Sequence, residues 1–163
     1  MRSAHILRGV MMRREEEDIP SENAVDEWIY AHGVGEGCYE DGHSFTGKWL
    51  IWASWADVDE RWEQIKQATE AGQLGVSAKV STIRPNAYKR KDHVIEVYTS
   101  DYRDEASVGG VLRGLRRLGI SGVLYYKTEQ DTISGVYSSE GPYTKKKGPS
   151  SRYTSDYFEK PSL

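Results

Sequence analysis

Cysteine is almost absent from this chain of 163 residues, and a long apolar run is missing altogether. The single cysteine, Cys38, excludes a disulfide within the chain and any metal site built from several cysteines, and it is typical of a protein from a reducing compartment. Without about 18 consecutive apolar residues the sequence predicts no membrane span, and the first residues lack the apolar core of a secretory signal. We therefore expect a cytoplasmic protein with no membrane partner.

The motifs of common metal and cofactor sites are also missing. Residues 33–42 contain four glycines, but no Gly-Lys-Ser or Gly-Lys-Thr follows them, which excludes a phosphate-binding P-loop. The four histidines show no metal-ligand spacing, and a Gly-x-Ser-x-Gly nucleophile motif is absent. The sequence thus predicts no metal and no cofactor, and we interpret Cys38 as a free thiol.

What the chain does contain is an uneven distribution of charge. Residues 1–75 carry 7 Lys or Arg against 15 Asp or Glu, whereas residues 76–163 carry 15 against 10. A basic half in a mildly acidic protein favours an anionic ligand at a local site over the broad coating of nucleic acid, which needs a strongly basic domain. The alternative is a solvated surface of interleaved charges.

Apolar periodicity predicts a flexible arm over residues 1–22, followed by a single domain over residues 23–163. We expect helices near 23–29, 57–71 and 104–118, strands near 48–53, 77–84, 93–99, 122–127 and 132–137, and a C-terminal aromatic cluster of Tyr153, Tyr157 and Phe158 that packs on the domain. This order predicts an α+β fold, in which helices pack on one face of a curved, mainly antiparallel sheet. The other face stays partly open, where a ligand can bind.

The same segments resemble a known family. Residues 46–137 contain Gly47-Lys48-Trp49-Leu50, a helix that starts at Val58 and includes Trp62, Ala78-Lys79-Val80-Ser81, Val94-Ile95-x-Val97-Tyr98-Thr99, Tyr126-Lys127 and Gly135-x-Tyr137. In this order and with these gaps they resemble the basophilic-leukaemia-expressed protein family, whose fold is similar to that of translation initiation factor 4E. The resemblance implies an initiation-factor-4E-like sheet and leaves the function open.

Cap binding, the activity of initiation factor 4E, is disfavoured by departures from that pattern. Cap binders stack a charged methylguanine base between two tryptophans and bind its edge with a glutamate. Here no segment between Gly75 and Ser77 supplies the corresponding second strand pair. Trp55 remains available as one wall, but the Trp62-Glu63 pair lies on a helix, with Trp62 in the buried stripe.

The candidate ligand site is a set of basic and aromatic residues on the predicted strands and their flanks. Alternation places Lys79 and Ser81 on the face opposite Ala78 and Val80. Arg and Lys bind phosphate, and Tyr offers both a ring face and a hydroxyl. We therefore predict a site for a nucleotide, an RNA end or a phosphorylated group, formed by Lys79, Ser81, Arg84, Tyr98, Tyr126, Lys127, Tyr137, Trp55 and Arg152. The alternative is a solvated sheet face.

Two other functions stay open at this stage. A Lys-x-His pair resembles that of phosphothreonine lyases, so Lys91 with His93, or Lys79 or Lys127 in acid-base roles, would make the chain a phosphate-processing enzyme. Arg113, Arg116 and Arg117 share one helix face, which would suit a protein interaction domain. The Lys145–Lys147 run is either a phosphate clamp or a charged loop.

Overall fold

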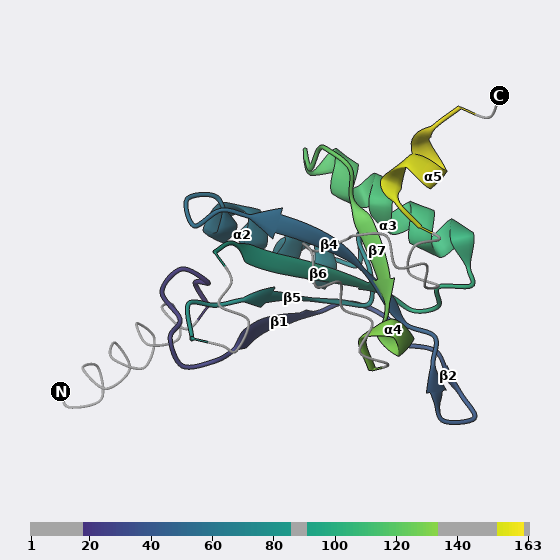
Figure 1. Ribbon diagram of the computed structural model, residues 1–163, viewed down its shortest axis with the longest axis horizontal. Coiled ribbons are helices and arrows are strands. Elements are labelled where there is room, and N and C mark those ends of the chain that lie inside the picture. Colours follow the sequence, from purple (N-terminus) through teal and green to yellow (C-terminus); the bar gives the residue numbers. More distant parts are fainter. Residues whose placement is uncertain (1–17, 86–90, 134–152, 162–163) are drawn as a thin grey trace.

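A five-stranded antiparallel sheet forms the centre of the computed structural model, which describes residues 18–85, 91–133 and 153–161 (Figure 1). The strands of this sheet lie in the order β1-β5-β6-β4-β7, and all four strand pairs are antiparallel. The elements are β1 (Trp28–His32), β2 (Tyr39–Glu40), β3 (His43–Ser44), β4 (Gly47–Ala53), α2 (Val58–Glu70), β5 (Ser77–Ser81), β6 (His93–Thr99), α3 (Glu105–Arg117), β7 (Tyr125–Thr128), α4 (Glu129–Ile133) and α5 (Ser155–Glu159). The predicted α+β class is confirmed.

Helices α2 and α3 lie on the same face of the sheet (Figure 1). Each buries a stripe spaced by three or four residues, as the sequence predicts. The α3 stripe comprises Val108, Val111, Leu112 and Leu115, and the α2 stripe comprises Val58, Trp62, Ile65 and Thr69. Both helices are followed by a glycine at positive φ, Gly72 at 72° and Gly119 at 83°. Glycine adopts this left-handed backbone conformation without steric cost, which is why it commonly ends a helix.

The core lies between these helices and the sheet residues that face them. Strand β4 contributes Trp49 and Ile51, and β6 contributes Ile95 and Val97, all almost fully buried. The C-terminal aromatic cluster packs on the same core, which confirms its predicted docking: the Tyr126 and Tyr153 rings lie 5.6 Å apart edge to face. Phe158 of α5 meets Trp49 at 6.0 Å.

The first expected helix is wrong, because residues 28–32 form strand β1. Val25, Trp28 and Ile29 fit a helical spacing, but Ile29 and Ala31 are buried while Tyr30 and His32 are exposed, which is the alternation of a strand. The Asn23 side chain accepts hydrogen bonds from the Val25 and Asp26 amides, both at 2.9 Å, so it stabilises a turn before the strand.

The last expected strand is also corrected where the structure describes it. Thr132 lies in helix α4, which starts directly after β7, and residues 134–137 lie outside the described residues. Of the predicted arm, residues 1–17 also lie outside them. Ser21 lies against α2, where its amide donates to the Asp59 carboxylate at 2.9 Å. No helix in the described part of the chain is long and apolar enough to cross a membrane.

Candidate functional site

The sheet face opposite α2 and α3 carries a cluster of lysines, here called the lysine face: Lys48, Lys79, Glu96, Tyr98 and Lys127. The strand register places them in neighbouring positions. Lys79 of β5 pairs with Glu96 of β6, and Lys48 of β4 lies between Tyr98 of β6 and Lys127 of β7. The antiparallel sheet therefore brings together residues that are up to 79 positions apart in the sequence.

Glu96 is the centre of this face and is 7% exposed. One of its oxygens, Oε2, lies 3.1 Å from Lys48 Nζ and 3.4 Å from Lys79 Nζ, and it accepts a hydrogen bond of 2.9 Å from the Tyr98 hydroxyl. Burial alone would raise the pKa of Glu96, but Lys48, Lys79 and the Tyr98 hydroxyl outweigh it and hold the pKa below the usual value of 4.5. Glu96 is thus a fixed anion.

Lys48 is held as a cation by two carboxylates. Its Nζ lies 2.8 Å from Oε1 of Glu129, the first residue of α4, in addition to its contact with Glu96. Burial lowers the pKa of Lys48, but the two glutamates outweigh this effect, so the pKa lies above 10.5. The Tyr98 pKa is raised by burial and by the nearby Glu96 carboxylate, which keeps its hydroxyl protonated as a donor.

The pKa of Lys127 is shifted in the opposite direction to that of Lys48. Partial burial and the positive charge of Lys48, its partner across the strands, lower the pKa of Lys127 below 10.5. Like charges in directly opposed positions of a sheet repel each other. The carboxylates of Glu96, Asp131 and Glu129 act in the opposite direction on the pKa of Lys127, but the lowering effects outweigh them.

Aromatic rings lie next to Lys79, which, like Lys127, is only partly buried. Lys79 Nζ lies 4.1 Å from the centre of the Trp28 ring and 5.9 Å from that of Tyr98, both within the range of cation–π contacts. Tyr30, which pairs with Lys79 across β1 and β5, is 56% exposed. The lysine face thus combines cations with ring surfaces on which a planar group can stack.

The remaining predicted site residues do not all join this face. Ser81 lies on it by register but is buried, and its hydroxyl accepts from the Val94 amide at 3.0 Å. Arg84 lies beyond the end of β5, where it donates to the Val25 carbonyl at 3.1 Å. Trp55 lies beyond the end of β4 and donates to the Lys91 carbonyl at 2.9 Å. Tyr137 and Arg152 lie outside the described residues.

Tyr126 belongs to the opposite side of the sheet. Its ring packs against Trp49 in the core, its hydroxyl shares a hydrogen bond with Thr99, and burial raises its pKa. In a strand, neighbouring residues point to opposite faces, so Tyr126 and Lys127 cannot face the same ligand. The structure therefore places Tyr126 in the core and not on the lysine face with Lys127.

The structure separates His93 from the lysines of the enzyme alternative. His93 is 2% exposed, and its Nδ1 lies 2.7 Å from the Ser81 carbonyl oxygen. By register it pairs with Ala53 and points to the helix-covered side, away from Lys79. Lys91 is exposed, whereas the imidazole of His93 is not accessible as an acid. The described residues therefore assemble no lysine–histidine pair.

Of the three arginines on α3, one is engaged within the molecule. Arg116 donates to both carboxylate oxygens of Glu159, at 2.9 and 2.8 Å, and to the Ile120 and Gly122 carbonyls. It therefore holds α5 and the segment after α3 together. Arg113 and Arg117 are exposed.

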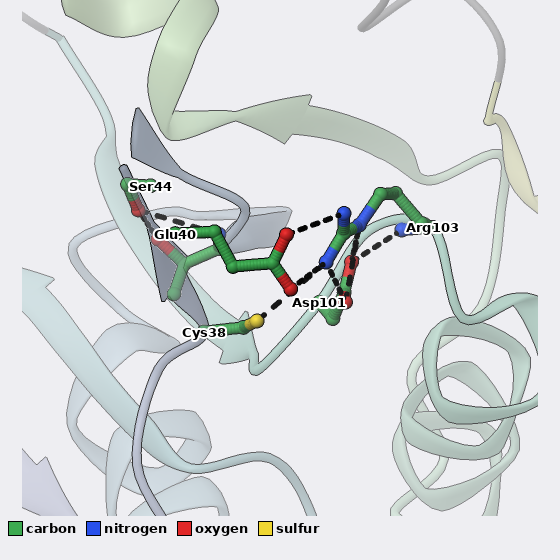
Figure 2. Close-up of polar contacts among 6 residues, drawn as sticks. Cys38, Glu40, Ser44, Asp101 and Arg103 are labelled. Atoms are coloured by element: carbon green, nitrogen blue, oxygen red, sulfur yellow. Dashed lines mark hydrogen bonds and ion pairs between the residues drawn. The ribbon is translucent and has the colours of Figure 1, made fainter. Parts of the chain in front are cut away.

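A second polar cluster, which the sequence did not predict, surrounds Cys38 (Figure 2). Arg103 donates to Asp101 at 2.8 Å and to Glu40 at 3.2 Å, approaches Cys38 Sγ at 3.6 Å, and lies 3.6 Å above the Phe45 ring. These contacts tie the β2–β3 hairpin to the loop before α3. Among the described residues no group of His, Cys, Asp and Glu is arranged to hold a metal ion.

Sequence reasoning missed two residues of the lysine face as site residues, Lys48 and Glu96, and it also missed their neighbours Glu129 and Trp28. Lys48 was used only as part of a strand motif, although the alternation of residues 47–53 would have shown on which face of the sheet it lies. Glu96 is the one charged residue in an otherwise apolar strand, which was the available signal for a buried ion pair. Trp28 was missed because its segment was assigned to a helix.

Comparison with known proteins gives one family and one group of structures. Residues 40–132 match the family model of basophilic leukemia-expressed protein Bles03. A schistosome eIF4E complexed with m7GpppA and 4E-BP is 18% identical over 68% of this chain and 58% of that one, with a TM-score of 0.49. A C. elegans eIF4E-3 with the 4E-binding protein Mextli and a cap analog is 21% identical over 55% of this chain and 54% of that one, with a TM-score of 0.44. In each case the match spans less than two thirds of the solved chain.

Proposed function

This chain belongs to the Bles03 family, and we propose that it is a binding protein that holds an anionic, nucleotide-like ligand against the lysine face. The observation that carries the proposal is the combination of Lys79 and Lys127 with exposed or half-exposed rings on one sheet face. Ammonium groups bind phosphate oxygens, and rings stack on planar bases. A nucleotide or the phosphorylated end of an RNA presents both groups.

The buried part of the face supports this function by fixing the accessible part. Lys48 and Glu96 are too deeply buried to be the main contacts of a ligand. Glu96 instead accepts from Tyr98 and pairs with Lys79, so it fixes the direction of both side chains. A site whose side chains are fixed before binding loses less side-chain entropy when the ligand arrives. Glu96 is therefore a positioning residue.

Binding is favoured over phosphate-processing chemistry because the face lacks a suitable base. The pKa of Lys48 is raised, the pKa of Glu96 is lowered, and the hydroxyl of Tyr98 remains protonated. A general base needs a pKa near the working pH. Of the described residues with resolved shifts on this face, Lys127 alone moves toward that range, and His93 is on the other side.

Thermal unfolding in the presence of different anions tests the proposal. We expect GTP and a 5′-phosphorylated RNA oligomer to raise the Tm, whereas guanosine, which lacks the phosphates, should raise it little. Lys79→Ala should remove most of the GTP effect. Lys160→Ala, which removes an ammonium that is 73% exposed on the end of α5, is the matched control and should retain it. The proposal is wrong if no anion raises the Tm, or if both variants respond like the wild-type protein.

A further inference from the structure

The two edges of the five-stranded sheet differ in the described part of the chain. At the β7 edge the C-terminal segment pairs with the last strand: the Tyr126 amide donates to the Tyr153 carbonyl at 3.1 Å, and the Ser155 amide donates to the Leu124 carbonyl at 2.8 Å. At the opposite edge β1 pairs with β5 on one side, and no described strand lies on its other side. The outer side of β1 is therefore an open strand edge.

The backbone groups on the outer side of β1 include those of Tyr30 and His32. In an antiparallel pair every second residue exchanges its hydrogen bonds with the partner strand. The Gly33 amide donates to the Val76 carbonyl at 2.9 Å, so the odd-numbered residues of β1 bond to β5. The N–H and C=O groups of Tyr30 and His32 point away from β5, and within the described residues they have no hydrogen-bond partner.

Strand β1 also lacks the features that commonly protect a strand edge from further pairing. Its sequence, Trp-Ile-Tyr-Ala-His, contains no proline and no lysine, and its register with β5 continues without a bulge from Trp28 to His32. Tyr30 is 56% exposed, and Val34, just beyond the strand, is 77% exposed. A strand placed beside β1 would bond to the free backbone groups and cover part of the Tyr30 ring.

The segment that contains β1 is acidic. Residues 18–40 carry six Asp or Glu and no Lys or Arg. Within the described part of the chain, four of these carboxylates form no ion pair: Glu22, Asp26, Glu27 and Glu36. Contacts from other elements bring four cations to the segment: Lys66, Lys79, Arg84 and Arg103. Two of these cations are also paired with carboxylates outside the segment, so negative charge remains and favours a positively charged partner.

From the open edge and its acidic surroundings, we propose that β1 is a docking site for a basic peptide in extended conformation, which adds a sixth strand to the sheet. The peptide exchanges backbone hydrogen bonds with Tyr30 and His32, and its cationic side chains lie near Asp26 and Glu27. An extended partner is required because a strand presents N–H and C=O groups at the spacing of those of β1. A second copy of this chain, with β1 paired to β1, would bring two acidic segments together and is disfavoured by charge repulsion.

The peptide acetyl-Arg-Val-Tyr-Val-Arg-amide is the probe, and ¹H–¹⁵N NMR of the full chain follows its binding and reports whether each variant is folded. We expect saturable shifts of the Tyr30 and His32 amides and slower hydrogen exchange of both, because the peptide covers donors that are free without it. The amides of Ile29 and Ala31, which already bond to β5, should change little. The same peptide with Glu in place of both Arg should bind at least about tenfold more weakly.

Two substitutions at one position separate backbone pairing from side-chain contact. Tyr30→Pro and Tyr30→Thr both remove the ring, but proline also removes the outward N–H, and an edge strand tolerates it there. Tyr30→Pro should therefore bind the basic peptide at least about fivefold more weakly than Tyr30→Thr. Lys127→Ala, at the other edge of the sheet, is the control and should bind the peptide as the wild-type protein does.

Four results would overturn the proposal. The basic peptide does not saturate the protein, the acidic peptide binds equally well, or the folded Tyr30→Pro and Tyr30→Thr variants bind alike. The fourth is slow hydrogen exchange of the Tyr30 and His32 amides without any peptide, which would mean that the chain itself or a second copy already covers this edge.

Discussion

Glu96 determines how the lysine face behaves at the scale of single residues. Its carboxylate is buried in the centre of the sheet and contacts two ammonium groups and one hydroxyl. Removing one member of a buried ion pair costs more than removing both, because the remaining charge is left without compensation. The stability of the protein and the geometry of Lys79 therefore depend on the same side chain.

Glu96→Gln should lower the free energy of unfolding by about 3 kcal/mol at neutral pH, because Lys48 and Lys79 lose the charge that compensates them. Urea denaturation measures this loss. Glu60→Gln, at an exposed position of α2, is the control and should change stability by less than about 0.5 kcal/mol. An equal effect of both substitutions would contradict the assigned role of Glu96.

The same residue gives a pH dependence of stability. The pKa of folded Glu96 is lowered from 4.5, so its contribution is fully present above about 4.5 and is lost as the pH falls from there through the lower folded-state pKa. We expect the wild-type protein to lose stability in this acid range more steeply than Glu96→Gln. Urea midpoints measured between pH 7 and pH 3 check this difference, and parallel curves would contradict it.

Lys127 predicts a pH dependence of anion binding. Its pKa is lowered by burial and by Lys48, so it loses its proton at a lower pH than an ordinary lysine. An anion binds the charged form, and affinity for GTP should therefore fall as the pH rises through this lowered pKa. In Lys127→Arg the charge persists, and the fall should be smaller. Identical pH profiles in calorimetric titrations would exclude Lys127 from the site.

At the scale of the elements, helix α3 shows how closely the core is packed. It contains Gly109, Gly110 and Gly114, which are unfavourable residues inside a helix. A Cβ at Gly114 would lie 2.6 Å from Leu74 Cδ2 and 3.1 Å from the Gln73 carbonyl oxygen. A Cβ at Gly110 would meet only the flexible end of Arg113, at 3.7 Å. Close packing thus requires glycine at position 114 but not at position 110.

Gly110→Ala should therefore stabilise the protein by about 0.5–1 kcal/mol, because alanine loses less backbone entropy in a helix. Gly114→Ala, the same change four residues later, should destabilise it by about 1–3 kcal/mol because its methyl group overpacks the contact with Leu74. Thermal or urea unfolding of the two variants checks the opposite signs. Equal effects would show that α3 does not approach residues 73–74 this closely.

The elements also show which parts of the fold the sequence predicts. Helices α2 and α3 have apolar stripes with a helical spacing, strands β4 and β6 are short, mainly apolar runs, and β5 alternates between apolar and polar residues. Residues 28–32 were different, because Trp28 and Ile29 satisfy a helical spacing as well as a strand alternation. Pairing with β5 decides between the two, and such a long-range contact is not visible in the local pattern.

At the scale of the whole molecule, sheet order assembles the candidate site. The face on which Lys79 lies could be predicted from the alternation of a single strand. Its contact with Glu96 depends on β6 lying beside β5, and the position of Lys48 beside Lys127 depends on β4 lying beside β7. The same order places Tyr126 and His93 on the side that the helices cover. Sequence reasoning therefore identified Lys79 and Lys127, and it missed Lys48 and the carboxylates that position these lysines.

The most direct test of anion binding at the lysine face is isothermal titration of GTP into the wild-type protein and into the Lys79→Ala/Lys127→Ala double variant. The account predicts saturable binding to the wild-type protein and a loss of affinity of at least about a hundredfold in the double variant, because two charge-assisted contacts are removed. Each contact contributes about 1.5–3 kcal/mol. Equal affinity of the two folded proteins, or no binding by the wild type, would contradict the account.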